Sequence, residues 1–283
     1  MAAVQKQQAL IDLIRQALVL LRKETELDEN NQEQSEYCMN KKTIDCAFAS
    51  RCPCSQLDLV IIRLTLIDSM YSTNLQMRPY GIGELAEAIT SLGSDITLRN
   101  FLLSLLSTSN LTPFTINKAL FKTYKGGLTT SRNLFSETYG TEQGCQSEKK
   151  ALSLITKYAY FLTNHNFPIY DSLVKRVYPR FWNALSPGKQ ATKLNDNIVD
   201  YIKAINDLRV IIGNSITYDE FDNILWHVGK IDKAKKNGAR ITLILPMSDY
   251  LTVKGDVKTL CNSPAILSKN PLIDVYCKIA SII

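Results

Sequence analysis

The sequence predicts a mostly α-helical fold with a short extended segment near the C-terminus. Apolar residues recur three or four positions apart in segments spread along the 283-residue chain, which is the spacing of one buried helix face. Only residues 240–246, R-I-T-L-I-L-P, have the character of a strand. The chain is 45% hydrophobic and 21% charged, which is typical of a globular protein of about two average domains.

The first 56 residues are expected to form a helix followed by a polar, cysteine-containing linker. Apolar residues at helical spacing over residues 4–23 are Leu10, Ile11, Leu13, Ile14, Leu18 and Leu21. Charges at Asp12, Arg15 and Arg22 interrupt this stretch, so it predicts an amphipathic helix packed on the domain and not a membrane span. Residues 24–37 are acidic and amide-rich and predict an exposed linker.

The cysteine pattern indicates a reducing compartment. Seven cysteines are an odd number, which argues against a secreted disulfide framework and favours a cytoplasmic protein. Four of them crowd together at Cys38, Cys46, Cys52 and Cys54. Their spacing lacks the paired C-x2-C pattern of zinc knuckles, so we expect thiols, with no metal and no cofactor. A structural zinc site is the alternative.

Further helices are predicted along the rest of the chain. They cover residues 57–75, 82–92, 95–108, 113–122, 148–162, 197–212 and 218–230. Pro113 suits a first helical turn, and Gly213 suits a helix end. A basic cluster from Lys230 to Arg240 follows the last of these helices.

The most informative segment places Lys157 on an aromatic and apolar helix and Asp171 at the start of the next helix. Asp171 suits an N-cap, and Val174, Val177 and Phe181 follow at the spacing of a buried stripe. An amine and a carboxylate at helix starts suit covalent chemistry on a sugar C1′. The amine attacks and forms an imine, and the carboxylate stabilises the positive charge that develops.

Each of these residues also has a simpler explanation. Lys157 shares a helix face with several polar residues, so it could be an ordinary solvated lysine. Asp171 could be a helix cap and nothing more, which is the commonest role of an aspartate before a helix. The catalytic interpretation therefore depends on the two residues occurring together in this string.

The string from Asp171 to Phe181, D-S-L-V-K-R-V-Y-P-R-F, resembles the D-T-H-V-x-R-V-x-x-R-L helix of helix–hairpin–helix DNA glycosylases. This superfamily includes endonuclease III and 8-oxoguanine glycosylase. Residues 156–159, T-K-Y-A, resemble the T-K-V-A of the oxoguanine branch, which carries the Schiff-base lysine. Residues 59–74 are similar to the first helix of the six-helix domain. The P-I-Y-D-S sequence resembles a bacterial oxoguanine-glycosylase-like subgroup, some of whose members are linked to anti-phage defence.

The resemblance implies a two-subdomain helix–hairpin–helix glycosylase-like fold. Residues 57–145 would form the helical base-pocket subdomain, and residues 146–283 the catalytic subdomain, closed by C-terminal helices. Lys157 would be the nucleophile and Asp171 its electrostatic partner. The expected base-pocket residues are Tyr71, Asn74 and Trp226, because extruded bases are held by stacking and edge hydrogen bonds. The expected DNA contacts are Lys150, Lys175, Arg176, Arg180 and Lys230.

These features predict a monomeric, cytoplasmic DNA glycosylase that binds double-stranded DNA and does not bind a membrane. It would flip out and excise a modified base, either an oxidised purine or a hypermodified phage cytosine, and leave an abasic site. A lysine imine also permits AP-lyase strand nicking. The net charge of +6 allows DNA binding without requiring it.

A non-catalytic DNA-binding or phage-defence subunit that retains the fold is the alternative. Residues 152–155, which align with the family's glycine hairpin, contain no glycine, and this favours the alternative. The lysine–aspartate pair opposes it.

Overall fold

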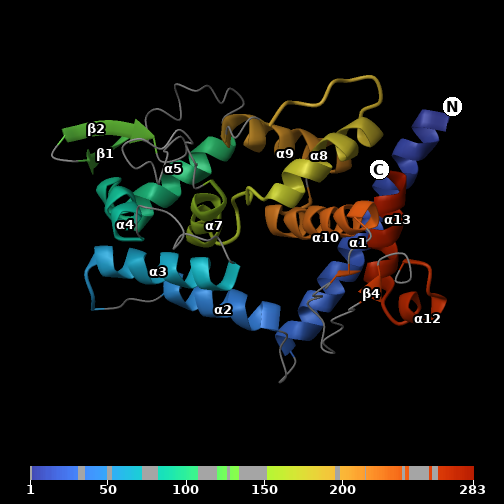
Figure 1. The fold of residues 1–283 in the computed structure, drawn as a ribbon, viewed down its shortest axis with the longest axis horizontal. Helices are drawn as coiled ribbons and strands as arrows, with labels where there is room; N and C mark the ends of the chain where they lie inside the picture. Colours follow the sequence, from blue (N-terminus) through green and yellow to red (C-terminus); the bar gives the residue numbers. More distant parts are fainter. Residues whose placement is uncertain are drawn as a thin grey trace. The chain divides into compact units, whose positions relative to one another are not determined.

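The computed structural model describes residues 2–30, 36–49, 53–71, 82–107, 120–125, 128–133, 152–194, 198–213, 215–237, 240–241, 255–256 and 261–283. These residues are mostly helical, so the predicted fold class is confirmed at that level (Figure 1). The helices are α1 Ala2–Asn30, α2 Glu36–Ala49, α3 Gln56–Tyr71, α4 Ile82–Ser91, α5 Asp95–Ser107, α7 Leu152–Leu162, α8 Ser172–Leu185, α9 Ile198–Ile212, α10 Tyr218–Asn237, α12 Pro264–Leu267 and α13 Pro271–Ile282.

The chain divides into two compact units that interleave along the sequence. Unit 1 contains Met1–Lys41, Asp171–Lys193 and Ile205–Ile283, and unit 2 contains Lys42–Tyr170 and Leu194–Ala204. The sequential segments 1–56, 57–145 and 146–283 differ from these units. Their functional assignments stay a prediction.

Unit 1 is built on α1, α8, α10 and α13. Helix α1 packs against α13, and α10 packs against both α8 and α13 (Figure 1). The predicted stripe of the N-terminal helix is buried at Leu10 and Ile14, both 0% exposed. The predicted stripe of α8 is buried at Val174, Val177 and Phe181. Because each helix has one apolar face, burial against neighbouring helices supplies the main stabilisation.

The exposed linker predicted for residues 24–37 is wrong over most of its length. Helix α1 continues to Asn30, and α2 begins at Glu36. Glu24, Glu26 and Leu27 are good helix formers, so a helix already nucleated and packed at Leu21 propagates through them. Residues 31–35 lie outside the described part of the chain.

Unit 2 contains α3, α4, α5 and α7, with a β-hairpin. Strand β1, Leu120–Lys125, pairs antiparallel with β2, Leu128–Asn133, and Lys125 lies opposite Leu128. The helix predicted for residues 113–122 is therefore wrong at 120–122, while 113–119 lie outside the described residues. Two glycines, Gly126 and Gly127, connect the paired strands, and a two-glycine connection favours a tight hairpin over a continuing helix.

The extended segment near the C-terminus is present as a short strand pair. Strand β3, Arg240–Ile241, pairs antiparallel with β4, Gly255–Asp256. The remainder of the predicted run, residues 242–246, lies outside the described residues. The described helices include none that is both long enough and apolar enough to cross a membrane.

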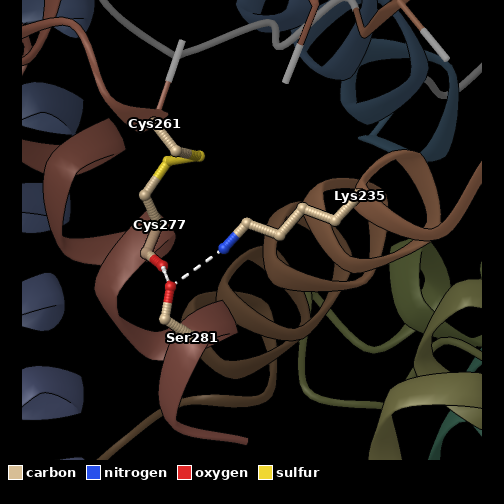
Figure 2. The surroundings of a disulfide bond; sticks show 4 residues. All are labelled: Lys235, Cys261, Cys277 and Ser281. Carbon is tan, nitrogen blue, oxygen red and sulfur yellow. Dashed lines mark hydrogen bonds between the residues drawn. A yellow bond between two sulfur atoms is a disulfide. The ribbon is translucent and has the colours of Figure 1, made fainter. Parts of the chain in front are cut away.

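A disulfide joins Cys261 to Cys277 of α13, in unit 1 (Figure 2). The cysteine count did not predict this bond, because an odd total excludes full pairing but not a single bridge. Of the N-terminal cysteines, Cys46 and Cys54 carry thiols. The side chains of Cys38 and Cys52 are not described. Within the described residues, no group of three or more His, Cys, Asp or Glu side chains is arranged to hold a metal ion.

Candidate functional site

Asp171 is the N-cap of α8, as predicted. Its backbone is extended, with φ −123° and ψ 145°, and its Oδ1 accepts a hydrogen bond of 2.7 Å from the Leu173 N–H. Its carbonyl oxygen accepts from the Lys175 N–H at 2.9 Å. A carboxylate in this position satisfies an N–H that has no partner within the helix. The charge of Asp171 is therefore held at a defined place.

Helix α10 packs closely on this first turn of α8 at Gly229. A Cβ added to Gly229 would lie 3.1 Å from both the Cβ and the carbonyl oxygen of Leu173. Only glycine allows the two helices to approach this closely without a shift of the backbone. The next residue along α10, Lys230, is thereby held near the capped end of α8.

Lys230 has an unusual electrostatic environment. Its Nζ lies 3.6 Å from the centroid of the Trp226 ring, one helical turn earlier on α10. Burial lowers the pKa of Lys230 to about 8, although the charge of Asp171 acts in the opposite direction and raises it. Asp171, Leu173, Trp226, Gly229 and Lys230 all belong to unit 1, and we call them the α8–α10 cluster.

The α8–α10 cluster combines a carboxylate, an aromatic face and an amine with a lowered pKa. A lysine with an ordinary pKa near 10.4 is almost entirely protonated at neutral pH, whereas a pKa of about 8 leaves roughly a tenth of the amine uncharged at pH 7. Such an amine can act as a nucleophile or a base. The i,i+4 spacing of Trp226 and Lys230 was the available sequence signal for their contact, but nothing local predicts the approach to Asp171.

Lys157 lies on α7, in unit 2, and its side chain is buried. It is 6% exposed, and its Nζ donates a 2.9 Å hydrogen bond to Ser153 Oγ. The explanation of Lys157 as a solvated lysine is therefore wrong. The Lys157 Nζ lies 5.3 Å from the centroid of the Tyr71 ring. The structure thus brings together two residues predicted for the site, Lys157 and Tyr71.

The segment between α7 and Asp171 is held by hydrogen bonds inside unit 2. Thr156 Oγ1 donates to the Leu152 carbonyl oxygen at 2.7 Å and accepts from the Tyr170 N–H at 2.9 Å. The Tyr201 hydroxyl donates to the Ile169 carbonyl oxygen. Because Thr156 adjoins Lys157, these bonds tie the lysine helix to the end of the aromatic turn.

The basic residues predicted to contact DNA have different environments. On α8, Arg176 is exposed and Lys175 is half-buried. Arg180 forms an ion pair with Asp232, whose side chain is 5% exposed. Lys236 also lies near Asp232, at 3.5 Å. Lys150 and the predicted base-pocket residue Asn74 lie outside the described residues.

A separate hollow lies in unit 2 beside the end of α7. It has a volume of about 330 Å³, and its lining includes Asp45, Phe48, Arg99 and His165. His165 Nε2 lies 2.7 Å from Asp45 Oδ1. The sequence gives no local signal for this pair, because the two residues are 120 positions apart.

No protein-family model, curated protein or solved structure matches the chain.

Proposed function

We propose that the chain is a DNA glycosylase of the helix–hairpin–helix class that excises a modified base from double-stranded DNA. The observation that carries the proposal is the capped carboxylate of Asp171 at the start of α8. It occupies the position that the resemblance assigns to the family's essential aspartate. The basic residues of α8, Arg176 above all, then supply phosphate contacts beside that carboxylate.

Asp171 would stabilise the positive charge that develops on the deoxyribose as the glycosidic bond breaks. A carboxylate that is already oriented needs no reorganisation at the transition state, and this is the main source of electrostatic catalysis. The bond from the Leu173 N–H fixes the position of Oδ1.

Lys157 would supply the amine that attacks C1′. Lys157 is buried on α7, so its amine is held in a defined place, which supports this role. Ser153 accepts a hydrogen bond from Nζ and orients it. The C1′–N bond of the base breaks as the lysine Nζ–C1′ bond forms, and the base leaves after taking up a proton. Nζ then loses a proton, the C1′–O4′ bond of the sugar ring breaks, and O4′ takes up a proton. The imine formed in this way permits β-elimination and strand nicking.

The resemblance assigns Tyr71, Asn74 and Trp226 to the base pocket. Tyr71 lies beside Lys157 in unit 2, and aromatic side chains hold extruded bases by stacking. Oxidised guanine and hypermodified phage cytosine are both candidate bases.

The test is a base-release assay on duplexes that carry each of these modified bases, followed by borohydride trapping. The wild-type protein is expected to release one of the bases and to form a covalent adduct with the DNA. Lys157→Gln should abolish the adduct. Asp171→Asn keeps a good N-cap, so it should bind DNA normally while releasing the base more slowly by orders of magnitude. Lys203→Gln, at an exposed lysine of α9, is the matched control and should behave as wild type.

A non-catalytic DNA-binding subunit is the second candidate, and one observation favours it. Leu152–Ile155, which aligns with the family's glycine hairpin, is the first turn of α7. A glycine hairpin lets the backbone approach a phosphate closely. A helical turn presents its N–H groups differently. The test would establish this candidate and reject the glycosylase if the protein bound DNA but released no base, and if Asp171→Asn bound DNA as well as the wild type.

A further inference from the structure

The hollow beside the end of α7 has the size and the lining of a small-molecule site. Its volume of about 330 Å³ is at the lower end of the range for such sites, about 300 to 1,000 Å³. All of its lining residues belong to unit 2. We propose that this hollow binds a small monocarboxylate that carries an apolar ring, with Arg99 as the anchor for the carboxylate. This inference goes beyond the glycosylase proposal and requires no DNA.

Arg99, on α5, brings a positive charge to the hollow. Two carboxylates line the same hollow, and each already has a partner. Asp95 Oδ2 accepts a 2.7 Å hydrogen bond from Arg63 Nη1. Asp45 Oδ1 lies 2.7 Å from His165 Nε2. Of the residues that the structure describes, none forms an ion pair with Arg99, so its guanidinium can receive an anion from solution.

The charges around Arg99 favour a carboxylate over a phosphate. A planar guanidinium matches a carboxylate through two parallel N–H···O bonds. Asp45 and Asp95 lie at the same hollow, and their negative charges repel a dianion more strongly than a monoanion. The single guanidinium of Arg99 also balances one negative charge. A ligand with one carboxylate therefore fits the electrostatics of the hollow.

Apolar side chains supply much of the remaining lining, namely Phe48, Ala49, Ile96, Phe161 and Leu162. The rings of Phe48 and Phe161 stack, with their centroids 5.8 Å apart. Ile96 is 72% exposed, which is unusual for a large apolar side chain. An apolar ring on the ligand would cover Ile96 and pack against the phenyl rings, and this burial would stabilise the complex.

The wall that His165 forms is fixed in place. Asn164 and His165 both have left-handed backbones, with φ of 52° and 62°, a conformation that persists only where the surroundings hold it. The His165 N–H donates a 2.7 Å hydrogen bond to the Tyr160 carbonyl oxygen, and the two rings stack with centroids 4.6 Å apart. A wall that is ordered before binding lowers the entropic cost of binding.

The test measures the binding of phenylacetate to the full chain, without DNA, by ligand-observed NMR titration. Phenylacetamide has the same ring without the charge, and acetate has the charge without the ring. Phenylacetate is expected to bind saturably and at least about tenfold more tightly than either, because a hydrogen bond to a charged group and the burial of a ring each contribute a factor of about ten or more.

Three results of this titration would overturn the proposal. They are the absence of saturable phenylacetate binding, equal binding of phenylacetate and phenylacetamide, and tighter binding of phenyl phosphate, a dianion, than of phenylacetate.

Variants test whether binding occurs in this hollow. Arg99→Gln removes the anchor charge and should weaken phenylacetate binding at least about tenfold. Its thermal unfolding should match that of the wild type, because Arg99 has no ion pair to lose within the described residues. Ala49→Phe, at the end of α2, fills the hollow and should block binding while leaving Arg99 in place. Arg15→Gln, at an exposed arginine of α1, is the matched control and should bind as the wild type does. Wild-type affinity for phenylacetate in Arg99→Gln or in Ala49→Phe would overturn the proposal.

Discussion

Gly229 of α10 lies directly on Leu173 of α8, so close that a Cβ on Gly229 would meet the Leu173 carbonyl oxygen at 3.1 Å. The contact joins the two helices at the turn capped by Asp171. It makes Gly229 a structural requirement of the α8–α10 cluster, even though glycine is unfavourable inside a helix.

Gly229→Ala is expected to destabilise unit 1 by about 1 kcal/mol. Replacing a helical glycine by alanine gains up to about 1 kcal/mol, but overpacking against a backbone costs about 1 to 3 kcal/mol. Thermal or urea unfolding measures the difference. Gly83→Ala, on α4, is the control, because nothing lies within 4 Å of its added Cβ and the variant should be neutral or slightly more stable. A stabilised Gly229→Ala would contradict the tight contact.

Arg176 and Arg180 are expected to differ in DNA binding, if the proposed function holds. Arg176 is exposed, whereas Arg180 is neutralised by Asp232. Arg176→Ala should reduce the slope of log affinity against log salt by about 1, because one fewer counterion is released. Arg180→Ala should leave the slope unchanged while lowering protein stability, because it leaves Asp232 with fewer partners. Fluorescence anisotropy over a salt series measures both slopes. A smaller slope in Arg180→Ala alone would mean that Arg180, and not Arg176, contacts the phosphates.

Arg63→Met is expected to destabilise unit 2 by about 3 kcal/mol. The Arg63 side chain is 1% exposed, and its guanidinium pairs with Asp95 at 2.7 Å. It also donates to the carbonyl oxygens of Ala47 and Phe48. Removing one member of a buried charge network leaves the others without compensation. Denaturant unfolding measures the loss. Arg15→Met, in the exposed Arg15–Asp12 pair, should cost under about 1 kcal/mol.

Stability should fall between about pH 10 and pH 12 because of Tyr158. Burial raises the pKa of the Tyr158 hydroxyl to about 12, from 10 in an exposed tyrosine. The folded chain therefore keeps a proton that the unfolded chain loses, so the contribution is full below pH 10 and is lost as the pH rises to 12. Unfolding measured along this range should show a decline that is smaller in Tyr158→Phe. An equal decline in the variant would exclude Tyr158 as its source.

Reduction of the Cys261–Cys277 disulfide should lower stability by about 3 kcal/mol, the value expected for a loop of this size. The two cysteines are 16 positions apart, and Cys277 lies on α13, which packs against α1 and α10. Unfolding with and without dithiothreitol measures the effect. The Cys261→Ser, Cys277→Ser double variant should no longer respond to the reductant. A wild-type protein that is insensitive to reductant would show that the bond adds no stability.

Local patterns predicted several elements because their causes are local. The stripe of Val174, Val177 and Phe181 follows from helical periodicity. The Asp171 cap follows from the preference of a short carboxylate for the first free N–H groups. The prediction of a linker failed at residues 24–30, where the polar composition is only a weak signal against a helix and α1 continues through the segment. The prediction of a helix failed at residues 120–122 because strand pairing outweighed helical spacing.

The sequence by itself determined the mostly helical class, the apolar faces and the position of Asp171 at a helix start, since each depends on residues within a few positions of one another. Only the tertiary structure decided that Lys157 is buried and that Lys230 has a lowered pKa. Burial and charge are set by residues distant in sequence, and Lys230 lies 59 positions after Asp171. Desolvation depends on everything packed around a side chain, so no local pattern contains it.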